Sequence, residues 1–317
     1  MTTIGDQAFY SNPIESLELG NTVEKIGVFA FYSNHITSLT IPNSVTKIGA
    51  NAFKRGTITN LTLGSSLNRI GAEAFVSNQI TSLTLPDSLQ IVGRGAFASN
   101  ALTSLTFGAG LQSIGSEAFV NNALTSLAIP NSVNDIGVKA FSHNQIASLT
   151  LPNTITRISN FAFYDNLLTS VTIPATVTRI GDSAFRNNAL TAVTIPDSVT
   201  SIGTMAFRSN SLTSVSLGTG LTSIGVHAFS ANAITSVSIP DNVTSIGNYA
   251  FYGNQISSLT LGSSLDSIGA HAFRSNHIAS VTFPSSLRSI GAYAFRANGL
   301  RSLTIPNWVN SIGIRVI

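Results

Sequence analysis

The sequence predicts a solenoid in which about fourteen repeats of 22 residues stack on one another through parallel β-strands. Three observations predict this fold class. A Phe recurs at every 22nd position from Phe9 to Phe295, apolar and polar residues alternate in a short run of each repeat, and Pro or Gly follows the run. A fixed period of this length is typical of repeat proteins, and the alternation is typical of strands. Because such arrays lengthen by adding repeats, we expect one elongated domain over residues 1–317.

The alternating run predicts the strand of each repeat. In the repeat after Phe31, Leu39 and Ile41 are expected to point inward, and Ser38 and Thr40 outward. Pro42 then ends the strand. Since all copies run in the same direction, each strand is expected to pair in parallel with its counterpart one repeat on, roughly 4.8 Å away.

The second half of each repeat predicts a return leg and a turn. Val45 and Ile48 are spaced three apart, and Gly49 begins the turn. A short helical or irregular segment then carries Phe53. The Gly is present in every repeat except the one that has Ser159. We expect it to adopt a backbone angle that only Gly takes comfortably, so that Ser159 marks local strain.

Two other constant residues predict the interior. The Phe rings of successive repeats are expected to stack and to fill the space between the two legs. An Asn stands three residues after each Phe from Asn12 to Asn298, with Gly56 as the one exception. A buried Asn amide can bond to backbone groups of its own turn and of the neighbouring turn, so these residues predict a ladder along the core.

Composition excludes several classes of protein. Only 9% of the residues are charged, and 16 basic against 13 acidic side chains leave a net charge of +3. Nucleic-acid binding would need a dense basic stripe, which is missing. Cysteine is absent, so the redox compartment stays open. No apolar run reaches the length of a membrane span, and the first residues do not form a signal peptide. Partial repeats at both ends predict a slice of a longer array.

The phrase LTIPNSVTKIGANAF, which ends at Phe53, resembles the BspA-type (Treponema pallidum type) leucine-rich repeat, whose repeats read approximately LxxLxIPxxVxxIGxxAFxxC. The repeats here are slightly shorter, and Asn34 or Asn78 stands where that family often has Cys. The resemblance implies a right-handed, curved leucine-rich-repeat solenoid with its parallel sheet on the concave side and short helical or irregular turns opposite. It also implies a cell-surface or secreted protein that binds host proteins, other cells or matrix.

The residues predict neither catalysis nor a cofactor. His227 and His271 occupy the same place two repeats apart, roughly 10 Å by strand spacing, which is too far for them to share one metal ion. No Ser has a His and a carboxylate at comparable places of the repeat, and no glycine-rich phosphate loop is present. We therefore expect a protein that is not an enzyme and holds no metal.

The outward side chains of the strands form the first candidate surface, the Ser/Thr face. It is represented by Ser82, Thr84, Ser104, Thr106, Ser126, Ser148, Thr150, Ser170 and Thr172. Three interpretations are open. The face is a solvated surface of good strand formers, a hydrogen-bonding platform for an extended protein or glycan partner, or a hydroxyl lattice that matches ice.

The residue after each Phe forms the second candidate surface, the Tyr/Arg ridge. It comprises Tyr32, Tyr164, Arg186, Arg208, Tyr252, Arg274 and Arg296. A neighbouring row, two residues before the Phe, holds Phe29, Phe161, His227, Tyr249, His271 and Tyr293. Tyr and Arg dominate the hot spots of protein interfaces. The alternative is that these side chains shield the Phe layer while their polar tips stay in water.

Together these features predict a non-enzymatic recognition or adhesion module that binds a protein through the concave Ser/Thr face, the Tyr/Arg ridge, or both. A glycan is the second class of partner, while nucleic acid and membrane insertion are not expected. The alternative function is a structural spacer or a self-assembling array, because uncapped sheet edges invite end-to-end pairing.

Overall fold

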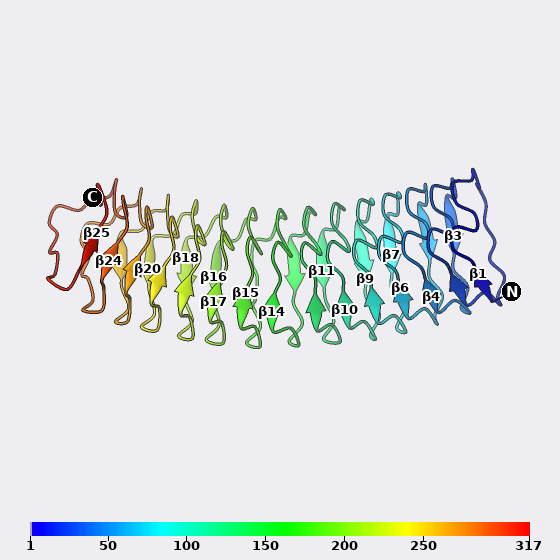
Figure 1. The fold of residues 1–317 in the computed structure, drawn as a ribbon, viewed down its shortest axis with the longest axis horizontal. Helices are drawn as coiled ribbons and strands as arrows, with labels where there is room; N and C mark the ends of the chain where they lie inside the picture. The colour runs from blue at the N-terminus through cyan, green and yellow to red at the C-terminus, as the bar shows by residue number, and fades with distance from the viewer. Residues whose placement is uncertain (1) are drawn as a thin grey trace. The chain divides into compact units, whose positions relative to one another are not determined.

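The computed structural model describes residues 2–317, which divide after Ile155 into two compact parts. They are called the N-terminal half and the C-terminal half below. In each half the 22-residue repeats form successive turns that lie side by side (Figure 1). The described residues contain strands and turns but no helix, so the helical form of the segment before each Phe is not confirmed.

In the N-terminal half, two-residue strands form one seven-stranded parallel sheet, and three-residue strands pair two by two. The sheet contains β1 (Thr3–Ile4), β2 (Lys25–Ile26), β4 (Lys47–Ile48), β6 (Arg69–Ile70), β8 (Ile91–Val92), β10 (Ser113–Ile114) and β12 (Asp135–Ile136). The pairs are β3 (Ser38–Thr40) with β5 (Asn60–Thr62), β7 (Ser82–Thr84) with β9 (Ser104–Thr106), and β11 (Ser126–Ala128) with β13 (Ser148–Thr150).

The C-terminal half repeats this arrangement. Its eight-stranded sheet contains β14 (Arg157–Ile158), β15 (Arg179–Ile180), β17 (Ser201–Ile202), β19 (Ser223–Ile224), β21 (Ser245–Ile246), β23 (Ser267–Ile268), β24 (Ser289–Ile290) and β25 (Ser311–Ile312). The three-residue pairs are β16 (Ala192–Thr194) with β18 (Ser214–Ser216), and β20 (Ser236–Ser238) with β22 (Ser258–Thr260).

The parallel pairing of the alternating runs is confirmed, for instance Ser38 with Asn60. The longer sheets, however, are made by the return leg, which the sequence did not predict as a strand. Ile48 of this leg is fully buried and pairs with Ile26 and Ile70 in register. The leg has one buried aliphatic residue beside one polar residue, which is too short a run for a period of two to be recognised.

The constant Gly has a different cause from the one expected. Gly49 does not lie in the left-handed region, and a Cβ atom built on it would come within 2.6 Å of the Gly27 carbonyl carbon. Gly203 and Gly225 are related in the same way. Close approach of successive backbones therefore requires Gly. Ser159 is not left-handed either, so the strain expected from its backbone angle has no basis.

The left-handed residues lie instead on both sides of the Phe. Tyr249 and Gly253, with φ of 58° and 66°, occupy the places two before and two after Phe251. Equivalent residues in other turns, such as Glu73 and His271, have φ of 57° and 60°. Backbone hydrogen bonds to the next turn hold this left-handed conformation, as from Tyr249 N to Ala270 O at 2.9 Å. Apolar, polar and charged side chains therefore all occur at these places.

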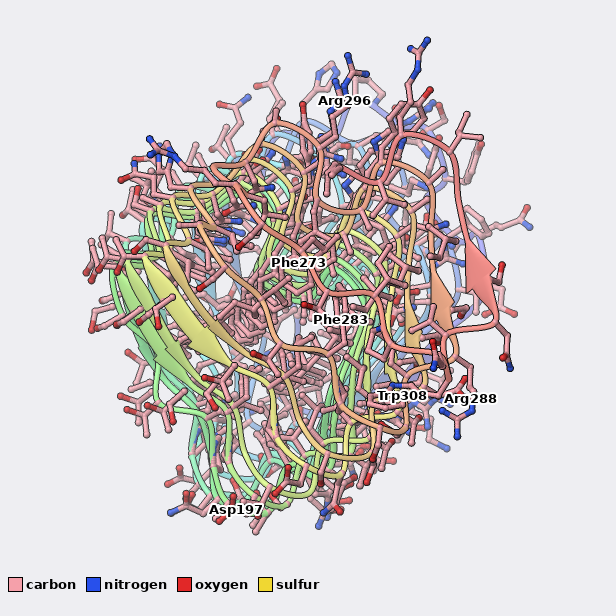
Figure 2. The ribbon with its side chains drawn as sticks, turned by 90° about the vertical axis from the view of Figure 1, so that its left-hand side faces the viewer. Asp197, Phe273, Phe283, Arg288, Arg296 and Trp308 are labelled. Atoms are coloured by element: carbon pink, nitrogen blue, oxygen red, sulfur yellow. The ribbon has the colours of Figure 1, made fainter. Side chains whose placement is uncertain are left out.

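The core follows the prediction closely. Phe53 and Phe75 stack with centroids 5.3 Å apart, and Phe229 and Phe251 do so at the same distance. Phe273 and Phe283 lie inside the coil in Figure 2.

Among the described residues, nothing helical has the length and apolar character that crossing a membrane requires.

The Asn ladder is confirmed. Asn78 Nδ2 donates to the Phe53 and Phe75 carbonyls at 2.8 and 3.1 Å, and Asn78 Oδ1 accepts from the Ile58 N–H at 3.0 Å. One amide thus satisfies three backbone groups of two turns. Where Gly56 replaces Asn, a Cβ atom would come within 2.6 Å of Asn78 Oδ1.

Candidate recognition surfaces

The predicted Ser/Thr face is solvent-exposed throughout. Ser82, Thr84, Ser104, Thr106, Ser126, Ser148 and Thr150 lie on β7, β9, β11 and β13 of the N-terminal half. Ser170 and Thr172 belong to the C-terminal half, in a turn where no strand forms at this place. Apolar neighbours such as Leu83 are buried, so the alternation works as the sequence predicted.

The same face of the C-terminal half is hollowed. One hollow, of about 740 Å³, lies over β18, β20 and β22, and its lining includes Ser216, Ser238 and Thr260 beside Leu217 and Ile239. A second hollow, of about 400 Å³, includes Ser170, Thr172 and Thr194. A third, of about 350 Å³, includes Thr260 and Thr282. Hydroxyl groups and aliphatic side chains therefore meet in open depressions along this half.

Tyr32 is the one member of the predicted ridge in the N-terminal half. It stacks on Tyr10 with centroids 4.8 Å apart, and Phe29 packs edge-on against it at 5.6 Å. Two basic side chains of this half along the same edge are paired with acids. Lys54 forms an ion pair with Glu73, and another joins Arg94 Nη2 and Glu117 Oε2 at 3.2 Å.

The other ridge residues lie together in the C-terminal half. Arg186 lies over the Tyr164 ring, with Cζ 5.6 Å from the centroid. Its Nη1 is 3.4 Å from the Met205 sulfur, and Arg208 Nη1 approaches the same sulfur at 3.9 Å. Arg274 lies over Tyr252 at 5.9 Å. The ridge thus brings cations next to rings and a thioether, which are weak partners for guanidinium groups.

The neighbouring row forms a continuous column of rings. His227 stacks on Tyr249 at 4.6 Å, Tyr249 on His271 at 4.4 Å, and His271 on Tyr293 at 4.8 Å. Arg296 lies over Tyr293, with Cζ 5.4 Å from the centroid, and occupies the edge of the cross-section opposite Asp197 in Figure 2. The column and the ridge therefore form one aromatic and cationic edge.

The two histidines of the column have lowered pKa values. Partial burial lowers the pKa of His227, and the charges of Arg208 and Arg186 add to the effect. Burial also lowers the pKa of His271, with Arg274 and Arg296 adding to it. His271 Nδ1 lies 3.3 Å from Arg274 Nη1. Because a guanidinium group can only donate, this nitrogen acts as the acceptor, which fits a neutral ring.

On the opposite edge, carboxylates cap the next turn. Asp197 Oδ1 accepts from the Thr219 N–H at 2.7 Å, and Asp241 Oδ1 accepts from the Ser263 N–H at 2.8 Å. These backbone bonds lower the pKa of both carboxyl groups, with the hydroxyls of the same residues contributing. Within residues 2–317 no group of three His, Asp or Glu residues could hold a metal ion.

Sequence reasoning missed two parts of the aromatic and cationic edge. It did not single out Met205, the residue between two arginines, and it did not predict the ring column. Reading one place of the repeat along successive turns would have found both, because Met205, His227, Tyr249 and His271 follow one another at intervals of 22 residues. Side chains at the same place of adjacent turns are nearest neighbours in a solenoid.

Similarity to known proteins agrees with this geometry. The chain matches the model of the BspA type leucine-rich repeat region over residues 2–125, 90–213 and 201–316. A leucine-rich repeat protein from Bacteroides ovatus is 22% identical, with a TM-score of 0.58 over 99% of this chain and 87% of that chain. The pneumococcal vaccine antigen PcpA is 23% identical, with a TM-score of 0.56 over 92% of this chain and 80% of that chain.

These solved structures support the fold alone at such identities. No protein of curated function is significantly similar to the chain. Leucine-rich-repeat solenoids are typically recognition scaffolds, and this family suggests a protein-interaction or adhesion module. The exact 22-residue period, the Phe stack and the family match over nearly the whole length lead to one conclusion: the chain belongs to the BspA-type leucine-rich repeat family.

Proposed function

We propose that the protein is a non-enzymatic recognition module that binds an extended segment of another protein along the Ser/Thr face of its C-terminal half. The observation that supports this proposal is the hollow of about 740 Å³ over β18, β20 and β22. Its hydroxyl groups, such as that of Ser238, can bond to the backbone of a bound segment. The flanking aliphatic residues Leu217, Ile239 and Leu261 can bury the apolar side chains of that segment.

The regular spacing of the turns favours an extended ligand. Exposed hydroxyls recur once per turn, at Thr194, Ser216, Ser238 and Thr260. An extended chain that crosses several turns would meet a similar set of donors and acceptors at each step. PcpA is described as a vaccine antigen, which supports the accompanying proposal that the present protein acts at a cell surface or after secretion. A spacer role and self-assembly remain predictions.

The test uses peptides selected from a random display library on the full chain and measured by calorimetry. Ser238→Lys places a long charged side chain in the hollow, and we expect it to weaken binding roughly tenfold or more. Gln255→Lys, at an exposed position outside the hollow, is the matched control and should leave binding unchanged. Equal binding by the wild type and Ser238→Lys, with both chains folded, would remove this face as the site.

A further inference from the structure

The cationic edge of the C-terminal half carries a second inference, independent of the Ser/Thr face. Arg186, Arg208, Arg274 and Arg296 occupy the same place in four turns, directly after a buried Phe. They are called the arginine edge. In the described part of the chain, none of the four forms an ion pair with a carboxylate.

The guanidinium groups of the arginine edge have few acceptors, and no carboxylate is among them. Arg274 Nη1 donates to His271 Nδ1 at 3.3 Å. Arg186 and Arg208 share only the Met205 sulfur, at 3.4 and 3.9 Å. The Nε atoms of Arg186, Arg208 and Arg274 are buried and have no hydrogen-bond partner. Buried donors are almost always paired in proteins, so each of these Nε–H groups is an unusual donor that lacks an acceptor. Two like charges that converge on one thioether also repel each other.

The rings beside the arginines hold them in place. Arg186 lies over Tyr164, Arg274 over Tyr252 and Arg296 over Tyr293, at 5.4 to 5.9 Å. A cation over a ring keeps its charge and its outward donors, while the ring restricts its rotamers. Arginines that are held in this way lose less conformational entropy when a ligand binds.

We propose that the arginine edge binds an acidic segment of a protein partner, with Asp or Glu carboxylates of that segment bridging Arg186 to Arg208 and Arg274 to Arg296. A carboxylate matches the planar guanidinium fork and accepts two hydrogen bonds from it. Tyr and Arg side by side are also the composition of protein hot spots. Four cations grouped in two pairs are too few for the continuous charge of a long polyanion.

The probe is a labelled peptide of eight glutamates, and the measurement is its fluorescence anisotropy with the full chain. An eight-glutamine peptide is the neutral reference. We expect the glutamate peptide to bind at low salt and the glutamine peptide not to bind. The double variant Arg208→Gln/Arg274→Gln should weaken binding roughly tenfold or more.

The matched control is Arg179→Gln/Arg288→Gln, which removes the same charge from two exposed positions of the same half. It should weaken binding less than about twofold, through the general field alone. Arg208→Lys/Arg274→Lys keeps the charge without the fork, so it should fall between wild type and the Gln pair. This variant also guards against misfolding of the Gln pair, and circular dichroism verifies each fold.

Three outcomes would overturn the proposal. The two Gln pairs could weaken binding equally, which would reduce the effect to net charge. The glutamate peptide could bind no more tightly than the glutamine peptide. Dextran sulfate could bind in an Arg208- and Arg274-dependent way while the glutamate peptide does not, which would assign the edge to sulfated glycans.

Discussion

The edges of the two halves share a backbone but balance charge in opposite ways. In the N-terminal half, Lys54 pairs with Glu73, and Arg94 with Glu117. The two glutamates occupy the place that Met205 occupies in the C-terminal half, where the nearby arginines find sulfur and rings in place of carboxylates. The first edge therefore has cations that are paired with acids of its own, whereas the second presents arginines that have no carboxylate partner.

The difference shows that the repeat separates its frame from its surface chemistry. Glu73 and His271 have nearly the same φ, 57° and 60°, although one is an acid and the other an aromatic base. The bonds that set this conformation come from the backbone of the next turn, as from Glu73 N to Arg94 O at 2.7 Å. A substitution at this place can thus change what an edge binds without changing the fold.

The largest expected effect tests whether the frames of the two halves are equivalent. Asn78→Ala and Asn254→Ala each remove three hydrogen bonds from buried backbone groups, at 2.8 to 3.1 Å. Because the partners are left unsatisfied, we expect each substitution to lower the free energy of unfolding by about 3 kcal/mol. Urea denaturation followed by circular dichroism measures the loss.

Asn43→Ala is the control for this experiment, because Asn43 is exposed on the opposite edge and accepts one bond, from Ser65 N at 2.9 Å. Its cost should be below about 1 kcal/mol. A difference of more than about 1 kcal/mol between Asn78→Ala and Asn254→Ala would contradict the view that one frame serves both halves.

The separation of the repeat's frame from its surface chemistry also decides how much of the fold the sequence predicts. The Phe stack and the Asn ladder could be predicted because one side chain explains each constant position. The cause of the constant Gly could not be, because Gly49 meets the backbone of another turn and not its own neighbours. Absence of a side chain looks the same in a sequence whether a left-handed angle or a close approach requires it.

The candidate sites were harder to predict for a related reason. The residue types of the ridge were recognised, but the difference between its two halves depends on partners one turn away. Lys54 and Arg186 occupy the same place of the repeat, yet one meets Glu73 and the other Met205. Both contacts join residues that are 19 positions apart, so neither composition nor local spacing reveals them.

The next prediction sharpens the contrast through pH. Both His227 and His271 have a folded-state pKa below the ordinary 6.5. As the pH falls below 6.5, the histidines of the unfolded chain therefore bind protons before those of the folded chain. The free energy of unfolding decreases as a result, until the pH has fallen below the lowered pKa values of the folded state. His227→Phe/His271→Phe keeps the ring column without the titration. We expect it to lose less stability than wild type between pH 7.5 and 5, by under about 1 kcal/mol because the rings are partly exposed.

Tyr249→Phe is the control for the histidine variant, since it retains both imidazoles and should keep the pH dependence of the wild type. The carboxyl groups of Asp197 and Asp241 do not confuse this measurement. Their pKa values lie below the ordinary 3.8, so the stability that they contribute is lost only at lower pH. If the double variant and wild type lose stability in parallel, the histidines are not coupled to folding.

The smallest effect on stability comes from converting one edge into the other. Met205→Glu gives the C-terminal half the residue that the N-terminal half has at Glu73, next to the guanidinium groups of Arg186 and Arg208. We expect a gain of about 0.5 kcal/mol that disappears in high salt, because partly exposed ion pairs are weak and screened. Met205→Gln, the uncharged control, should show no such salt dependence.

The same Met205→Glu chain should bind the eight-glutamate peptide more weakly than wild type, since its own carboxylate now occupies the arginines. A loss of stability with undiminished peptide binding would mean that Arg186 and Arg208 do not act as a pair, and the contrast between the two edges would then lie in composition alone.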